Sequence, residues 1–212
     1  TQAEIIDLPG IYSLYPRTLD EKIVAEILAD QKGSFYPDLV VLVADATNLK
    51  NCMLLLTQLI DLRLPTVLAL NMMDLAAQSG QSIDIQELSS SLDLQVVMIN
   101  ARTGQGIEEL KLILSGPVKP STNRIFNISD EIKSLVLTIK NKFGLTTDYE
   151  AYQFLQQTDN LVFLSREDRD YIFAQAKAIW CIRWSCIMCF MKKKLTKQTI
   201  QIFDIFGYQP LP

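Results

Sequence analysis

The chain has 212 residues, 49% of them hydrophobic, and a formal net charge of −4 at pH 7. This length and apolar content suit a folded protein with one large domain or two smaller ones. An acidic chain is a poor partner for nucleic acids, whose phosphates bind clustered lysine and arginine, so we expect no nucleic-acid partner.

Apolar runs and amphipathic stretches alternate along the first half of the chain. Continuous apolar runs rich in β-branched residues are typical of buried strands, and apolar residues at helical spacing indicate helices. We expect strands at residues 3–6, 38–45, 66–70 and 94–99, and helices at residues 19–28, 49–62, 84–92 and 107–114. This alternation predicts an α/β fold with a parallel sheet flanked by helices.

The pattern changes after residues 116–121, a segment with the Pro, Gly and Ser content of a linker. Helical spacing returns at residues 130–143 and 149–155, and Ser165 stands where it can cap a helix over residues 169–179. We therefore predict an α/β domain at residues 1–116, a small all-α domain at 117–180 and an atypical tail at 181–212.

The spacing of the cysteines does not indicate a metal site. The tail contains Cys181, Cys186 and Cys189, whose spacing matches no structural zinc motif, and the chain has no histidine to complete one. We expect the thiols to be reduced, as in a cytosolic environment. The apolar stretch at residues 178–191 is shorter than the roughly 20 residues that span a bilayer, so we expect the segment itself to be soluble.

Three polar motifs each follow a predicted strand. They are Asp7-Leu8-Pro9-Gly10, Asn71-Met72-Met73-Asp74 and Asn100-Ala101-Arg102-Thr103-Gly104. Ligands of open parallel sheets bind outside the carboxyl ends of the strands, so the motifs are expected to converge there. Separately, each motif is also compatible with a turn or a helix cap. Together they favour a guanine site, because the carboxylate of Asp74 can accept two parallel hydrogen bonds from guanine that adenine does not offer.

The same residues resemble the ferrous-iron transport protein B family, in its cytosolic GTPase domain and the helical domain that follows. The resemblance rests on residues 7–14, residues 37–49 and the motif around Asn71, and it covers roughly residues 1–175. Met72 stands where most related GTPases carry Lys, and it points to this family together with Tyr12-Ser13-Leu14. The resemblance implies a P-loop GTPase-like fold, with residues 1–116 as a partial GTP-binding domain.

The resemblance assigns the first motif to the phosphates of GTP or GDP. Asp7 would hold Mg²⁺ through a water molecule, and Gly10 would donate its backbone N–H to the γ-phosphate. Leu8 and Pro9 complete this part of the site, and residues 11–28 would form the second switch segment. No catalytic residue is assigned, because Ile11 stands where Ras-like enzymes place the Gln that orients the attacking water.

The other two motifs would bind the base. Asn71 and Asp74 would read guanine, with Met72 between them. Ala101 would donate its backbone N–H to the guanine carbonyl, Arg102 would stack on the base, and Asn100 replaces the more usual Ser.

The resemblance also implies parts that are absent. We find no glycine-rich phosphate loop and no first switch segment, and we expect both, with the first strand of the sheet, to lie upstream of Thr1. The chain is therefore expected to be an N-terminally truncated fragment that does not bind GTP tightly alone. The alternative is a non-catalytic fragment or an interaction module without GTP binding.

In the family, GTP binding and hydrolysis would regulate Fe²⁺ uptake across the bacterial inner membrane. The resemblance thus implies a GTPase, with guanine nucleotide and Mg²⁺ as cofactors. It places this segment at the cytoplasmic face of the membrane. Its expected partner is the transmembrane domain of the full-length protein, and a homo-oligomer is left open.

Overall fold

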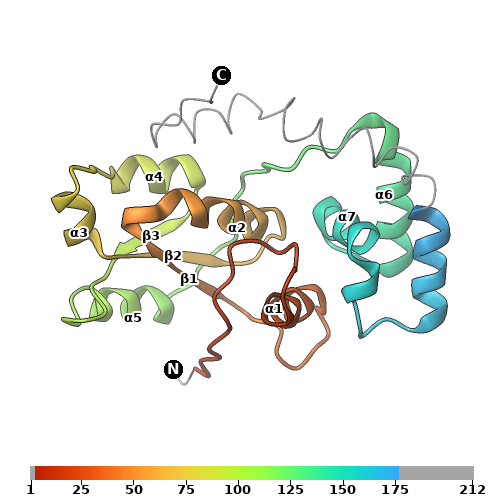
Figure 1. Ribbon diagram of the computed structural model, residues 1–212, viewed down its shortest axis with the longest axis horizontal. Helices are drawn as coiled ribbons and strands as arrows, with labels where there is room; N and C mark the ends of the chain where they lie inside the picture. Colours follow the sequence, from red (N-terminus) through yellow and green to blue (C-terminus); the bar gives the residue numbers. More distant parts are fainter. Residues whose placement is uncertain (1–2, 177–212) are drawn as a thin grey trace. The chain divides into compact units, whose positions relative to one another are not determined.

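The computed structural model describes residues 3–176, which fall into two compact units (Figure 1). Among the described residues, the first unit comprises residues 3–24 and Phe35–Arg124, and the second comprises Ala25–Ser34 and residues 125–176. The predicted tail at 181–212, with its three cysteines, lies outside the described residues, as do residues 177–180.

The first unit is built on a three-stranded parallel sheet, in the order β1-β2-β3. Its strands are β1 (Val40–Asp45), β2 (Thr66–Asn71) and β3 (Gln95–Met98). The central strand is buried from Thr66 to Leu70, because it has a neighbour on each side and helices over both faces. The predicted α/β class and three of the predicted strands are confirmed.

Helices cover both faces of this sheet. Helix α5 (Ile107–Ser115) lies on one side, and helices α2 (Leu49–Asp61) and α4 (Ile85–Leu92) lie on the other (Figure 1). On the α5 side, Val67, Ala69 and Val97 form an apolar cluster against which Ile107 and Leu110 pack. Full burial of one such side chain stabilises the fold by about 1.5–3 kcal/mol relative to exposure.

The predicted strand at residues 3–6 is wrong. The structure has no strand there, and the side chains of Ile5 and Ile6 are 88% and 46% exposed. A strand needs a hydrogen-bonded neighbour, and within residues 3–176 nothing pairs with this segment or with the outer edge of β1. The helix that follows, α1 (Leu19–Ala29), is confirmed, whereas α3 (Met73–Gln78) was not predicted.

The second unit is helical. It contains α6 (Asp130–Phe143), α7 (Asp148–Gln156) and a helix over residues 166–176, whose first turn is capped by Ser165 through the N–H of Asp168 at 3.0 Å. Its core includes Val136, Ile139, Phe154 and Ile172. Within residues 3–176 no helix combines the length and the apolar character needed to cross a bilayer.

Residues 117–124 belong to the first unit because side chains hold them there. Ser121 Oγ donates to the carbonyl of Leu92 at 2.8 Å, and the N–H of Thr122 donates to Asp93 Oδ2 at 2.7 Å. The hydroxyl and the N–H of Thr122 both donate to the Asp93 carboxylate, and these two hydrogen bonds lower the pKa of Asp93. The structural division therefore falls after Arg124, whereas the sequence placed it at residue 116.

Candidate nucleotide-binding site

A sharp turn at the end of β2 presents the motif that begins at Asn71. The N–H of Met72 donates to Asn71 Oδ1 at 3.0 Å, and Met72 has a positive φ of 62°. Such a backbone is uncommon for a residue other than glycine. It reverses the chain so that α3 begins at Met73, which places Asp74 in the first turn of that helix with its side chain exposed.

The loop after β3 is organised by Asn100. Its side-chain oxygen accepts from the N–H groups of Arg102 and Thr103, each at 3.1 Å, and its carbonyl accepts from the N–H of Gly104 at 2.8 Å. These bonds fold the loop back on itself, with a bridge between Asn100 and Gln105. In this structure Asn100 therefore shapes the loop that carries Ala101.

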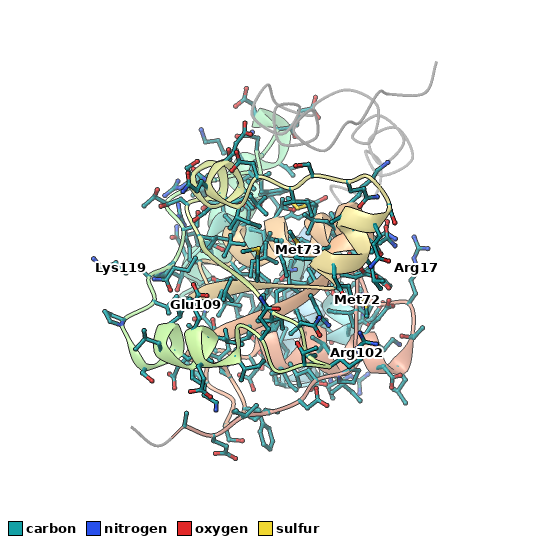
Figure 2. All side chains as sticks on the ribbon, turned by 90° about the vertical axis from the view of Figure 1, so that its left-hand side faces the viewer. Arg17, Met72, Met73, Arg102, Glu109 and Lys119 are labelled. Atoms are coloured by element: carbon teal, nitrogen blue, oxygen red, sulfur yellow. The ribbon has the colours of Figure 1, made fainter. Side chains whose placement is uncertain are left out.

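The two loops are joined directly. The N–H of Ala101 donates to Asn71 Oδ1 at 3.2 Å, so a side chain at the end of β2 holds the backbone beyond β3. Figure 2 looks onto this edge of the sheet and shows Met72 and Arg102 on the same side of it. The same N–H is the one that the resemblance assigns to the guanine carbonyl; in this structure it donates to Asn71, and its role toward the base stays a prediction.

Gly106 closes the second loop and was not singled out from the sequence. Its φ is 78°, and a Cβ at this position would lie 2.0 Å from the carbonyl oxygen of Met98. No other residue fits so close to the end of β3. The signal available in the sequence was the pair of glycines, Gly104 and Gly106, immediately before a helix.

The first motif lies in an exposed segment without helix or strand. Asp7, Pro9 and Gly10 are exposed and Leu8 is half-buried. Within the described part of the chain, no hydrogen bond links residues 7–10 to either of the two joined loops. The structure thus brings together two of the three motifs, and the roles of Asp7, Leu8, Pro9 and Gly10 stay predictions.

The chemistry of these loops suits a planar polar ligand rather than a metal held by several side chains. Asp74 offers two acceptor oxygens, Asn71 offers an amide, and Arg102 offers a flat cation that can stack. Among residues 3–176 there is no group of three or more Cys, Asp or Glu side chains placed to hold a metal ion. A single carboxylate such as that of Asp7 can still hold Mg²⁺ through water, because this ion keeps several of its water ligands.

Comparison with known proteins gives consistent matches. The family model described as Ferrous iron transport protein B matches residues 1–113. The Fe(2+) transporter FeoB of Leptospira biflexa serovar Patoc is 35% identical over 167 residues, which make up 78% of this chain and 23% of that protein. The Fe(2+) transport protein A/Fe(2+) transporter FeoB fusion protein of Porphyromonas gingivalis is 42% identical over 107 residues, 50% of this chain and 12% of that one.

A solved structure matches both units. The cytosolic domain of the T. maritima FeoB iron transporter in its GMPPNP form has a TM-score of 0.59 and 29% identity, covering 81% of this chain and 73% of its own. The chain spans 23% and 12% of the lengths of the two curated relatives, so the match concerns one part of those proteins.

Proposed function

The chain belongs to the ferrous iron transport protein B family, and on that premise we propose that it is the guanine-nucleotide-binding part of a ferrous iron transporter. The observation that carries the proposal is the hydrogen bond from Ala101 to Asn71, which holds two loops at the carboxyl edge of the sheet. Asp74 follows one of these loops and Arg102 lies in the other. The chain therefore offers an acceptor pair and a stacking group for a base.

Guanine fits this acceptor pair by its own donors. Its N1–H and its exocyclic amino group lie side by side and match the two oxygens of the Asp74 carboxylate, whereas adenine presents no such pair. Buried or oriented polar groups left without partners penalise the wrong ligand strongly, so selectivity for guanine over adenine follows. Asn71 has a second role in the proposal, because its amide lies between the two loops and would lie beside the base.

The phosphates are assigned to residues 7–10. Asp7 would hold Mg²⁺ through water and Gly10 would donate its N–H to the terminal phosphate, with Leu8 and Pro9 shaping the turn between them. Asp7 is exposed and is a hard oxygen donor, which suits this ion. When bound, Mg²⁺ would neutralise phosphate charge, and the Asp7 carboxylate would fix its place.

We include GTP hydrolysis in the proposal because the chain belongs to this family. Ile11 follows Gly10 and cannot orient a water molecule, so no residue of this chain is assigned a catalytic role. We place the chain on the cytoplasmic face of the bacterial inner membrane, where nucleotide binding would regulate passage of Fe²⁺, the cargo. The membrane domain of the whole transporter would be its partner, and assembly of that transporter into a homo-oligomer is the further step of the proposal.

Free nucleosides carry no phosphate, so their binding tests recognition of the base apart from that of the phosphates. Saturation-transfer NMR on this chain is expected to show signal for guanosine and little for adenosine, and Asp74→Ala is expected to abolish the difference. Asp159→Ala, an exposed aspartate in the second unit, is the matched control. Equal signals from the two nucleosides would contradict guanine recognition. The absence of binding by guanosine and by GDP would support the interaction module instead.

A further inference from the structure

The segment before α1 enters the protein interior at one residue. Residues 3–18 contain no helix or strand, and in this stretch the side chain of Leu14 is buried, with 1% of its surface exposed. Its neighbours differ, because Tyr12 and Tyr15 are 61% and 39% exposed. The segment that carries Asp7 and Gly10 is thus fixed to the fold a few residues beyond them.

Gln58 on α2 holds this point. The N–H of Leu14 donates to Gln58 Oε1 at 2.7 Å, a buried bond between residues 44 apart in the sequence. Gln58 Nε2 donates to Ser13 Oγ at 3.4 Å, and the same hydroxyl accepts from the N–H of Tyr15 at 3.1 Å. Gln58 is itself 4% exposed, so its amide is committed to this segment and not to solvent.

The polar character of Gln58 is needed because Leu14 is buried. Insertion of the leucine side chain carries its backbone N–H into the interior, where a donor without a partner is costly. An apolar residue at 58 would bury the same side chain but remove this acceptor. The amide therefore lets Leu14 enter the interior with its backbone N–H bonded.

We propose that Gln58 is a positioning residue that clamps the chain at Leu14 and so fixes the end of the irregular, mostly exposed segment at residues 7–13. This rests on the proposed function, in which residues 7–10 contact the phosphates. Four residues span at most about 14 Å, so with Leu14 held by Gln58, Gly10 stays within that distance of a point fixed on the fold. Beyond the clamp the chain is held again, because Glu21 accepts from the N–H groups of Arg17 and Thr18 at 2.7 and 3.1 Å.

A displacement of residues 7–13 on nucleotide binding would therefore stop at Leu14, within the switch segment of residues 11–28 that the resemblance implies. Without the clamp it would extend towards α1. This is the difference that amide hydrogen exchange can measure, residue by residue, on the full chain.

The test compares Gln58→Met with Gln153→Met. Gln153 is the matched control because it is 6% exposed and donates to Tyr149 at 3.3 Å within the second unit. In Gln58→Met the amide of Leu14 is expected to exchange about tenfold faster relative to the amides of β2, as follows from losing one buried acceptor. Gln153→Met is expected to leave Leu14 unchanged. Equal acceleration in both variants, or none at Leu14, would overturn the clamp.

Ser13→Ala keeps the test decisive if Gln58→Met does not fold. It removes the acceptor for the N–H of Tyr15 and for the long bond from Gln58 Nε2, but leaves the bond from Leu14 to Gln58, so exchange should quicken at Tyr15 and not at Leu14. Acceleration at Leu14 as well would overturn the proposal. With added GDP, protection from hydrogen exchange in the wild-type chain should change at residues up to Leu14. In Gln58→Met the change should extend beyond Leu14. If GDP changes nothing in either chain while Gln58→Met still accelerates Leu14 selectively, the clamp stands and nucleotide binding fails.

Discussion

Asn71 and Ala101, which lie 30 residues apart in the sequence, are joined by a hydrogen bond from the backbone N–H of Ala101 to Asn71 Oδ1 at 3.2 Å. The same oxygen accepts from the N–H of Met72 at 3.0 Å. One amide oxygen therefore fixes both loops of the proposed base site before any ligand binds. Loops that are already in place lose less conformational freedom on binding, which favours affinity.

Replacing Asn71 tests this relationship. Asn71→Ala removes the shared acceptor, so the two loops lose their link and guanosine should bind at least about tenfold more weakly. The free energy of unfolding should fall by about 1 kcal/mol, since the lost bonds are exposed. Titration with guanosine and urea unfolding measure the two effects. Asn123→Ala is the control, because it loses a bond to the carbonyl of Ser91 outside these loops, and equal weakening by that variant would contradict the assignment.

The chemistry of Asp74 predicts a change of base preference. An asparagine at this position offers one acceptor and one donor, which match the N1–H and the C2 carbonyl of xanthine instead of the two donors of guanine. Asp74→Asn should therefore weaken GDP binding and strengthen binding of xanthosine diphosphate. Competitive titration with the two diphosphates measures the reversal. An unchanged preference for guanosine diphosphate, with an unchanged unfolding curve, would show that Asp74 does not face the base.

The strands that the sequence predicted well are those with partners in the fold. The apolar runs that became β1 and β2 are dense in β-branched and aliphatic residues and pair side by side in a parallel sheet, so local pattern and tertiary environment agree. Burial is complete only along β2, whereas most of β1 is half-buried and its Val43 is exposed. Residues 3–6 have a similar apolar pattern, but no neighbouring strand pairs with them among the described residues. Helix α3 spans six residues, too few for an apolar period to show.

The candidate site was predictable as a set of residue types and not as a geometry. Asn71, Asp74 and Ala101 could be named because the sequence places each motif just after an apolar run. The bond from Ala101 to Asn71 depends on strand register, which no local pattern contains. The positive φ of Met72 and the approach of Gly106 to Met98 are likewise products of the folded backbone.

Two glycines in one loop allow the cost of a left-handed backbone to be measured apart from the cost of a steric clash. Gly104 and Gly106 have φ of 80° and 78°, but a Cβ on Gly104 would meet nothing within 4 Å, whereas one on Gly106 would lie 2.0 Å from Met98 O. Gly104→Ala should cost about 1–2 kcal/mol, the penalty of a left-handed backbone. Gly106→Ala should cost more than about 3 kcal/mol, because the end of β3 must move as well. Chemical denaturation measures both, and equal costs would show that the approach is easily relaxed.

Glu150 makes the second unit sensitive to pH. Its side chain is 5% exposed, and burial raises its pKa above the ordinary 4.5, although the N–H groups of Thr147 and Thr146 act in the opposite direction. Those groups donate to Glu150 Oε2 at 3.0 and 2.7 Å, and Gln31 donates to Oε1. A raised native pKa means that the folded state binds the proton more tightly than the unfolded state. The associated stability is present below pH 4.5 and is lost as the pH rises through the raised pKa.

Glu150→Gln is expected to remove this dependence. The amide keeps one acceptor for the backbone N–H groups and cannot ionise, so the variant should gain stability relative to the wild type as the pH rises from 4 to 8. Urea unfolding of both chains at several pH values measures the difference. Glu167→Gln, at an exposed position in the helix over residues 166–176, should leave the wild-type dependence intact. If Glu150→Gln instead lost stability relative to the wild type with rising pH, the effect of the bonds from Thr146 and Thr147 on the pKa would outweigh that of burial. The carboxylate would then be the form that the folded state favours.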